Sequence, residues 1–144
     1  MTLENLLKIG QLKVHSTDRV EVGQLLEAAR RNLADAEVEA ISLETRFDVA
    51  YKSIMQVALV ALLANGYRAD SRGHHQLMIQ SLPLTISLPK ERMVVLDAMR
   101  RKRNAADYLG SYVDHGSVEV CVVQAQELLA DVERWLRENR PELV

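Results

Sequence analysis

Apolar residues recur at three- and four-residue spacing in four long stretches of the chain. The first stretch follows Asp18, which forms a capping-box-like start with Glu21, and its apolar positions continue to Ala36. The second begins after Ser42, a typical N-cap residue, and ends at Gly66, a typical C-terminal stop. Because this spacing puts the apolar side chains on one face, both stretches are predicted to be amphipathic helices.

Two further helices are predicted in the second half of the chain. One starts after Pro89 and carries apolar residues as far as Ala106, and residues 108–116 are expected to form a loop. The other starts with Ser117 as its N-cap and ends just before Pro141.

The remaining segments carry weaker signals. Residues 1–15 form at most a short helix and a connector, 67–73 read as a polar loop, and 74–81 fit two helical turns. Residues 82–89 alternate like a strand, but their two prolines and the lack of a partner strand favour an extended connector. A connection this long must cover one end of a bundle or shape a site.

Four long helices with one apolar stripe each predict an all-α protein, an antiparallel up-and-down bundle of four main helices plus short extra helices. Its 144 residues fit a single domain, with 1–17 as an N-terminal connector, 18–139 as the bundle and 140–144 as a tail. A composition rich in Leu, Ala, Val, Glu and Arg, and poor in aromatic residues, agrees with a helical fold.

Charge and cysteine content limit the functional classes. The net charge of −2 excludes binding of polyanions by the whole surface, so a nucleic-acid site must be a local patch. The single cysteine, Cys121, excludes an internal disulfide and fits a reducing compartment. No signal peptide is recognisable, and the longest apolar run, residues 57–64, is too short to span a bilayer. We therefore expect a cytoplasmic protein with no membrane association.

The most informative segment is the run of four cations at 100–103. Successive helical residues are about 100° apart, so the four side chains cannot share one direction. Arg103 falls on the inward stripe, where a guanidinium needs partners, and Asp107 or Asp48 can supply a carboxylate. Two interpretations stay open: a structural ion pair that fixes helix register, or a cleft in which Arg103 binds an anion such as phosphate. Asp97 is placed to neutralise Arg100 or Arg101.

Other candidate groups are weaker. His74 and His75, with Arg68 and Arg72, can contact a phosphate, but a solvated loop is the simpler interpretation. No set of residues has the spacing of a metal site, no phosphate-binding glycine loop is present, and no cofactor is expected. Cys121 lies on the apolar stripe of the last helix and fits a small core residue.

Two segments together resemble a prokaryotic branch of the HEPN superfamily. Residues 50–68 carry an Ala-Tyr pair, a later Ala-Leu-Leu and a final Gly-Tyr-Arg, as in the buried helix of that branch, and His74 or His75 follows where the family tends to place a histidine. The second segment resembles the family's Arg-x-x-Ala-Asp-Tyr signature and reads Arg103-Asn104-Ala105-Ala106-Asp107-Tyr108. The resemblance extends over about residues 46–135, most of the chain.

The resemblance implies a helical domain that pairs through its motif helix and acts on or binds RNA or nucleotides. Many members cleave RNA with an arginine followed, after four to six residues, by a histidine. Arg103 would be that arginine and Asn104 its polar neighbour, but Tyr108, Leu109 and Gly110 stand where the histidine is expected. Without this imidazole, the group that titrates near neutral pH for acid–base catalysis is missing.

We therefore expect an RNA- or nucleotide-binding module, part of a toxin–antitoxin or nucleotidyltransferase-associated system. The alternatives are an active ribonuclease with a non-standard residue set and a structural dimerisation bundle without a ligand. A homodimer is expected in each case, and a nucleotidyltransferase protein is a possible partner. The candidate catalytic residues by resemblance are Arg103, Asn104, Asp107 and Tyr108. The candidate ligand-binding residues are Arg103, Asn104, Arg100, Tyr108, Asp48 and His74.

Overall fold

A computed structural model describes residues 1–70 and 74–144. Its four long helices are α2 (Arg19–Ala36), α3 (Leu43–Ala64), α6 (Lys90–Leu109) and α7 (His115–Asn139). The short elements are α1 (Leu3–Lys8), β1 (Leu12–Val14), β2 (Tyr67–Ala69), α4 (His74–Gln80), α5 (Leu82–Thr85) and the 3-10 helix η1 (Pro141–Leu143).

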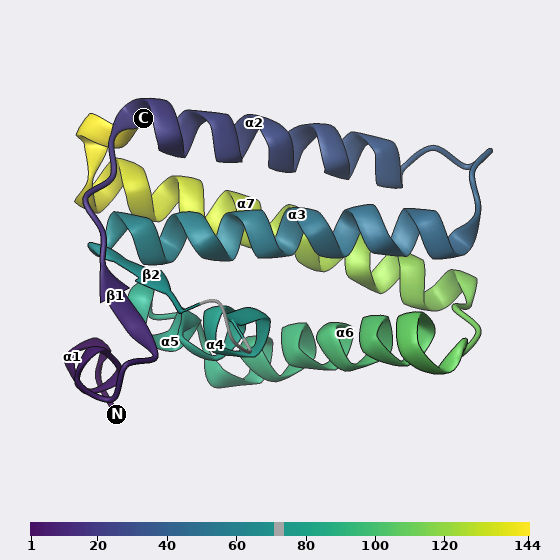
Figure 1. Cartoon of the computed structure of the whole chain (residues 1–144). Coiled ribbons are helices and arrows are strands. Elements are labelled where there is room, and N and C mark those ends of the chain that lie inside the picture. Colours follow the sequence, from purple (N-terminus) through teal and green to yellow (C-terminus); the bar gives the residue numbers. More distant parts are fainter. Residues whose placement is uncertain (71–73) are drawn as a thin grey trace.

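The four long helices alternate in direction, so the prediction of an antiparallel helical bundle is confirmed (Figure 1). α2 and α7 pack along α3, which lies in the middle of the bundle. α6 contacts α3 and the short helix α4. Side-chain interactions also join α6 to α7. One of them is the hydrogen bond from Lys102 Nζ to Ser117 Oγ, at 2.8 Å.

α3 owes its central place to its sequence. Ser42 caps its N-terminus by accepting a hydrogen bond from the Thr45 backbone N–H, and its second half is buried on nearly every side. It is the one helix, among the described residues, that is long and apolar enough to cross a membrane. However, 72% of its most apolar window is buried inside the protein, as in the core helix of a bundle.

The structure contains a two-stranded antiparallel ribbon that the pattern did not predict. β1 pairs with β2 in the register Leu12 with Ala69, Lys13 with Arg68 and Val14 with Tyr67. The predictions of a connector before residue 15 and of a polar loop from Tyr67 are therefore partly wrong. Leu12 is almost fully buried and anchors the ribbon to the core, and the backbone N–H of His15 bonds the Gly66 carbonyl.

Several predicted boundaries are also wrong. Residues 82–85 form the helical turn α5, with Leu82 and Thr85 buried, instead of an extended connector. α6 includes Tyr108 and ends at Leu109, and its C-cap Gly110 has a φ of 67°, which is left-handed and therefore favours glycine. Asp114, and not Ser117, caps α7, because its carboxylate accepts the Ser117 backbone N–H at 2.7 Å. The loop between the last two helices is therefore shorter than predicted.

The segment 140–144 packs against the bundle and is not a free tail. η1 buries Leu143, and the Arg140 guanidinium donates to the backbone carbonyl of Ala64 at the end of α3. The last residues therefore close one end of the bundle.

Candidate functional site

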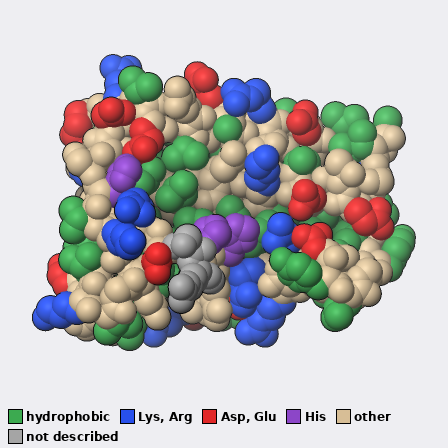
Figure 2. Space-filling model, in the orientation of Figure 1, with side chains coloured by type: hydrophobic (Ala, Val, Ile, Leu, Met, Phe, Trp, Pro, Cys, Tyr) green, Lys and Arg blue, Asp and Glu red, His purple; other side chains and the backbone are tan. Residues whose placement is uncertain are grey.

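A groove of about 880 Å³ opens between α2 and α3 on one side and β2, α4 and α6 on the other. In Figure 2 it appears as a hollow in which hydrophobic side chains lie between blue cations and purple histidines. The connection from Tyr67 to Pro89, which was expected to cover one end of the bundle or shape a site, contributes much of one wall of the groove. The volume falls in the range of small-molecule and cofactor sites.

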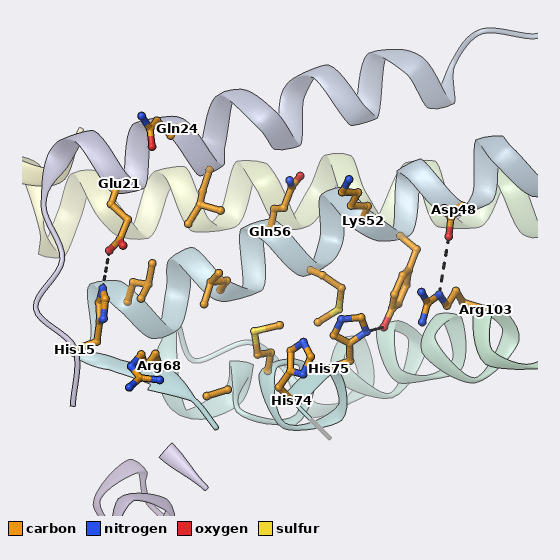
Figure 3. A pocket seen from close by; sticks show the side chains of 17 residues that line it. His15, Glu21, Gln24, Asp48, Lys52, Gln56, Arg68, His74, His75 and Arg103 are labelled. Atoms are coloured by element: carbon orange, nitrogen blue, oxygen red, sulfur yellow. Dashed lines mark hydrogen bonds and ion pairs between the residues drawn. The ribbon is translucent and has the colours of Figure 1, made fainter. Parts of the chain in front are cut away.

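The groove has an apolar floor and a polar rim (Figure 3). The face of α3 that borders it carries residues at helical spacing: Asp48, Tyr51, Lys52, Met55, Gln56, Leu59 and Leu63. α4 adds His74, His75 and Met78, and α2 adds Glu21, Gln24 and Leu25. Such a surface suits a ligand that has both a flat or apolar part and polar or charged groups.

Arg103 lies at one end of the groove and is held by three contacts. Its Nε lies 2.9 Å from Asp107 Oδ2 and 3.9 Å from Asp48 Oδ1, and its guanidinium carbon lies 5.7 Å from the centre of the Tyr51 ring. The side chain is still 27% exposed. Its Nε is buried within ion-pair distance of these carboxylates but makes no hydrogen bond. Arg103 therefore forms the predicted ion pairs and also lines a groove, while anion binding by Arg103 stays a prediction.

Tyr51 and His75 form a hydrogen-bonded pair next to Arg103. The Tyr51 hydroxyl lies 3.2 Å from His75 Nδ1, and the rings are tilted with centres 5.8 Å apart. Burial raises the pKa of Tyr51 to about 12, although the Arg103 charge opposes this, so the phenol stays neutral. Burial lowers the pKa of His75, and the charges of His74, Arg103 and Arg100 lower it further. At neutral pH His75 is therefore an uncharged imidazole that can accept or donate a proton.

The opposite end of the groove carries a third histidine, His15. His15 follows β1, and its Nε2 lies 2.8 Å from Oε1 of Glu21 in the first turn of α2. The Thr17 hydroxyl donates to the same oxygen at 2.6 Å. These hydrogen bonds lower the pKa of Glu21, the one from Thr17 most, and so keep its carboxylate charged. Arg68, exposed on β2, lies at this end as well (Figure 3).

The structure brings only part of the predicted set to the groove. Arg103, Asp48 and His74 line it, whereas Arg100, Asn104, Asp107 and Tyr108 do not. Arg100 bonds the buried carboxylate of Asp97 at 2.8 Å, and Arg101 lies 3.3 Å from the same carboxylate, as the spacing predicted. Tyr108 is 77% exposed near the corner between α6 and α7. Arg72 lies outside the described residues.

Tyr51, Lys52, His15 and Glu21 were not predicted as site residues. Glu21 was interpreted only as a helix cap, and the solvated-loop interpretation is wrong for His75, which is half-buried in α4. The face of α3 gave a usable signal, because Asp48, Tyr51 and Lys52 are polar residues at three- and four-residue spacing on an otherwise buried helix. No comparable signal marked His15.

Other sequence-based expectations concern metal and the cysteine. Among residues 1–70 and 74–144, no three His, Cys, Asp or Glu side chains are placed to hold a metal ion. Cys121 is fully buried, as predicted for a core residue, and burial raises the pKa of its thiol to about 12. His115, the next histidine after Arg103, is exposed beside Glu119 and does not reach the groove.

Comparison with models of known protein families gives no match, and no curated protein matches the chain either.

Proposed function

We propose that this protein binds RNA or a nucleotide in the groove, with Arg103 contacting a phosphate. The observation that carries the proposal is the position of Arg103 at the end of an apolar-floored groove, where part of its guanidinium remains accessible. Arginine binds phosphate well because its planar donors engage two oxygens at once.

The charges around the groove favour an anionic ligand. Lys52, Arg68 and Arg103 line it, against the carboxylates of Glu21 and Asp48. Within the described part of the chain, Lys52 and Arg68 have no ion-pair partner, so their charges are available to a ligand. The apolar floor between the cations offers a surface on which a nucleobase can lie.

Cleavage of RNA is a second candidate function, and the Tyr51–His75 pair favours it. The histidine expected four to six residues after Arg103 is missing, but α4 brings His75 into the same end of the groove. A neutral imidazole next to an arginine provides a proton-transfer group and a cation that stabilises developing negative charge on phosphate.

The first experiment measures binding of a fluorescently labelled RNA hexamer and of AMP by wild type and Arg103→Ala, at two salt concentrations. We expect affinity to fall about tenfold or more in the variant, because a hydrogen bond to a charged group contributes about 1.5–3 kcal/mol. Wild-type binding should weaken as salt rises, since phosphate contacts release counterions. RNA integrity is checked on a gel in the same samples, with His75→Gln included.

Arg134→Ala is the matched control, because Arg134 is an exposed α7 residue that lies outside the groove. Unchanged binding in Arg103→Ala, with a lower melting temperature, would reduce Arg103 to a structural ion pair and contradict the proposal. Cleavage by wild type that His75→Gln abolishes, while binding persists, would favour the ribonuclease function.

The resemblance to HEPN proteins supports two of three further proposals about context. From it we propose that the protein forms a homodimer and that it belongs to a toxin–antitoxin or nucleotidyltransferase-associated system. The third proposal, a cytoplasmic location, rests on the single cysteine, which fits a reducing compartment. The buried position of α3 supports a protein that is not inserted in a membrane.

A further inference from the structure

Two cationic side chains lie at or beside the end of the groove opposite Arg103. Arg68 projects from β2, and Lys13 lies directly opposite it in the ribbon register. Opposed residues of an antiparallel pair extend from the same face of the sheet, with Cβ atoms about 5 Å apart. His15 comes directly after β1, and its Nε2 forms a hydrogen bond with Glu21 Oε1.

The carboxylate of Glu21, at this end of the groove, already has hydrogen-bond partners of its own. Glu21 Oε1 accepts from the Thr17 hydroxyl and from His15, and no ion pair joins Glu21 to Arg68 among the described residues. Arg68 is exposed and has no ion-pair partner within residues 1–70 and 74–144. Its charge is therefore free to meet an anion at the rim of the groove.

The two cationic ends are separated by an apolar stretch. Along α3 the groove runs from Asp48, beside Arg103, past Met55 and Leu59 to Leu63, which at 1.5 Å per residue is roughly 22 Å. Gln24 and Gln56 lie along the upper wall, where their amides can donate and accept hydrogen bonds (Figure 3).

We propose that Arg68, supported by Lys13 and His15, forms a second phosphate subsite, and that the groove takes a short single-stranded oligonucleotide in preference to a mononucleotide. This proposal rests on the proposed function. A mononucleotide carries its phosphate at one end only and leaves one cationic end unused. A strand repeats phosphate at each nucleotide, so one phosphate meets Arg103 and a later one meets Arg68, while a base lies on the apolar floor.

The test compares 5′-phosphorylated RNAs of one to six nucleotides against wild type, Arg68→Gln and Arg103→Gln. For wild type we expect affinity to rise with length until both ends are occupied and then to level off. Arg68→Gln should weaken the hexamer about tenfold and AMP several-fold less than the hexamer, and it should reduce the salt slope for the hexamer by about 0.7. Arg103→Gln should weaken both ligands.

Arg137→Gln is the matched control, since it removes an exposed arginine of α7 that does not line the groove. Melting temperatures identify any loss of fold, which the exposure of Arg68 makes unexpected. Equal effects of Arg68→Gln on AMP and hexamer, or no effect on the hexamer, would overturn the second subsite while leaving nucleotide binding intact. If wild type binds neither ligand, the proposed function fails together with the subsite.

Discussion

Arg103 and His75 come from different helices and influence each other through charge. His75 is half-buried on α4, and burial is the main reason that its pKa lies below the usual 6.5. The positive charge of Arg103 adds to this effect, because a nearby cation disfavours the imidazolium. The state of the imidazole in the groove therefore depends on whether the arginine is present.

Replacement of Arg103 by Gln is expected to raise the pKa of His75 toward its usual value, since one of the neighbouring cations is lost. Burial and the charges of His74 and Arg100 remain, so the recovery should be partial. The measurement is an NMR titration of the histidine ring signals in both proteins. Arg134→Gln serves as the control, because Arg134 is exposed and bonds Asp131 outside the groove. An unchanged or lower pKa in Arg103→Gln would show that the charge does not act on the ring.

The lowered pKa of His75 also determines how the stability of the protein changes with pH. Below pH 6.5 the unfolded chain binds a proton at residue 75 more readily than the folded protein does, so protonation favours unfolding. The contribution of His75 to stability is thus fully present above pH 6.5 and is lost as pH falls toward the folded-state pKa. In Arg103→Gln this loss should be smaller, which denaturant titrations at a series of pH values would reveal.

Residue-level prediction from the sequence was successful where one helix carries both members of a contact. Asp97 with Arg100 and Arg103 with Asp107 follow from three- and four-residue spacing, and both pairs are formed. His75 next to Tyr51 joins residues 24 apart on different helices, and no local spacing encodes that contact. The residues that complete the groove are of this second kind, so the sequence predicted its arginine but not the contact between Tyr51 and His75.

At the scale of elements, the turn from α3 into β2 positions the Arg68 end of the groove. Gly66 has a φ of 91°, a left-handed conformation that L side chains rarely adopt, and its carbonyl accepts the backbone N–H of His15. A Cβ at this position would meet nothing within 4 Å, so a substitution would strain only the backbone. Gly23, in the helix α2, has equally open surroundings but no positive φ.

Alanine should therefore have opposite effects at these two glycines. Gly66→Ala is expected to lower the free energy of unfolding by about 1–2 kcal/mol, the usual cost of a left-handed conformation for a residue with a Cβ. Gly23→Ala is expected to raise it by about 0.5–1 kcal/mol, because alanine loses less backbone entropy in a helix. Urea denaturation of both variants and wild type measures the two changes. Stabilisation by Gly66→Ala would mean that the turn does not hold residue 66 in this conformation.

The ribbon shows why some elements cannot be predicted from pattern alone. β1 and β2 have three residues each and are more than 50 residues apart in the chain, so neither displays a period of its own. Residues 82–85 show the opposite case, a period that misleads. Their alternation of apolar and other residues resembles a strand, but they form a helical turn that buries Leu82 and Thr85. Short elements take their conformation from the surface they cover, and that surface exists only in the folded protein.

For the whole molecule, the bundle was predictable because each long helix carries a continuous apolar stripe. The last helix was predicted to carry such a stripe, and in α7 Val118, Leu128 and Leu136 are fully buried along it. The packing of α4 and α6 beside α3, which leaves the groove open toward α2, was not predictable. Stripes indicate which faces are buried, but they do not specify which helices are neighbours.

Cys121 provides a chemical measure of how firmly α7 is packed on α3. Its Sγ lies 4.0 Å from the carbonyl of Phe47, the side chain is fully buried, and the pKa of its thiol is raised to about 12. Only the thiolate of an accessible cysteine reacts with disulfide reagents. We expect native protein at pH 8 to react at least about 10³-fold more slowly than unfolded protein, because reaction requires opening of a core whose stability is several kcal/mol.

The control is Cys121→Ser combined with Ser111→Cys, which moves the only thiol of the sequence to an exposed position after α6. This variant should react at the rate of an unfolded thiol in native buffer, while wild type should approach that rate only as urea unfolds the bundle. A ligand that binds the groove should slow the wild-type reaction further, because it stabilises the closed state against opening. The same ligand should leave the rate at residue 111 unchanged, since that thiol reacts without opening of the core. Rapid reaction of native Cys121 would instead show that α7 separates from α3 easily, and the groove would then lack the rigid wall on which α3 displays Tyr51 and Lys52.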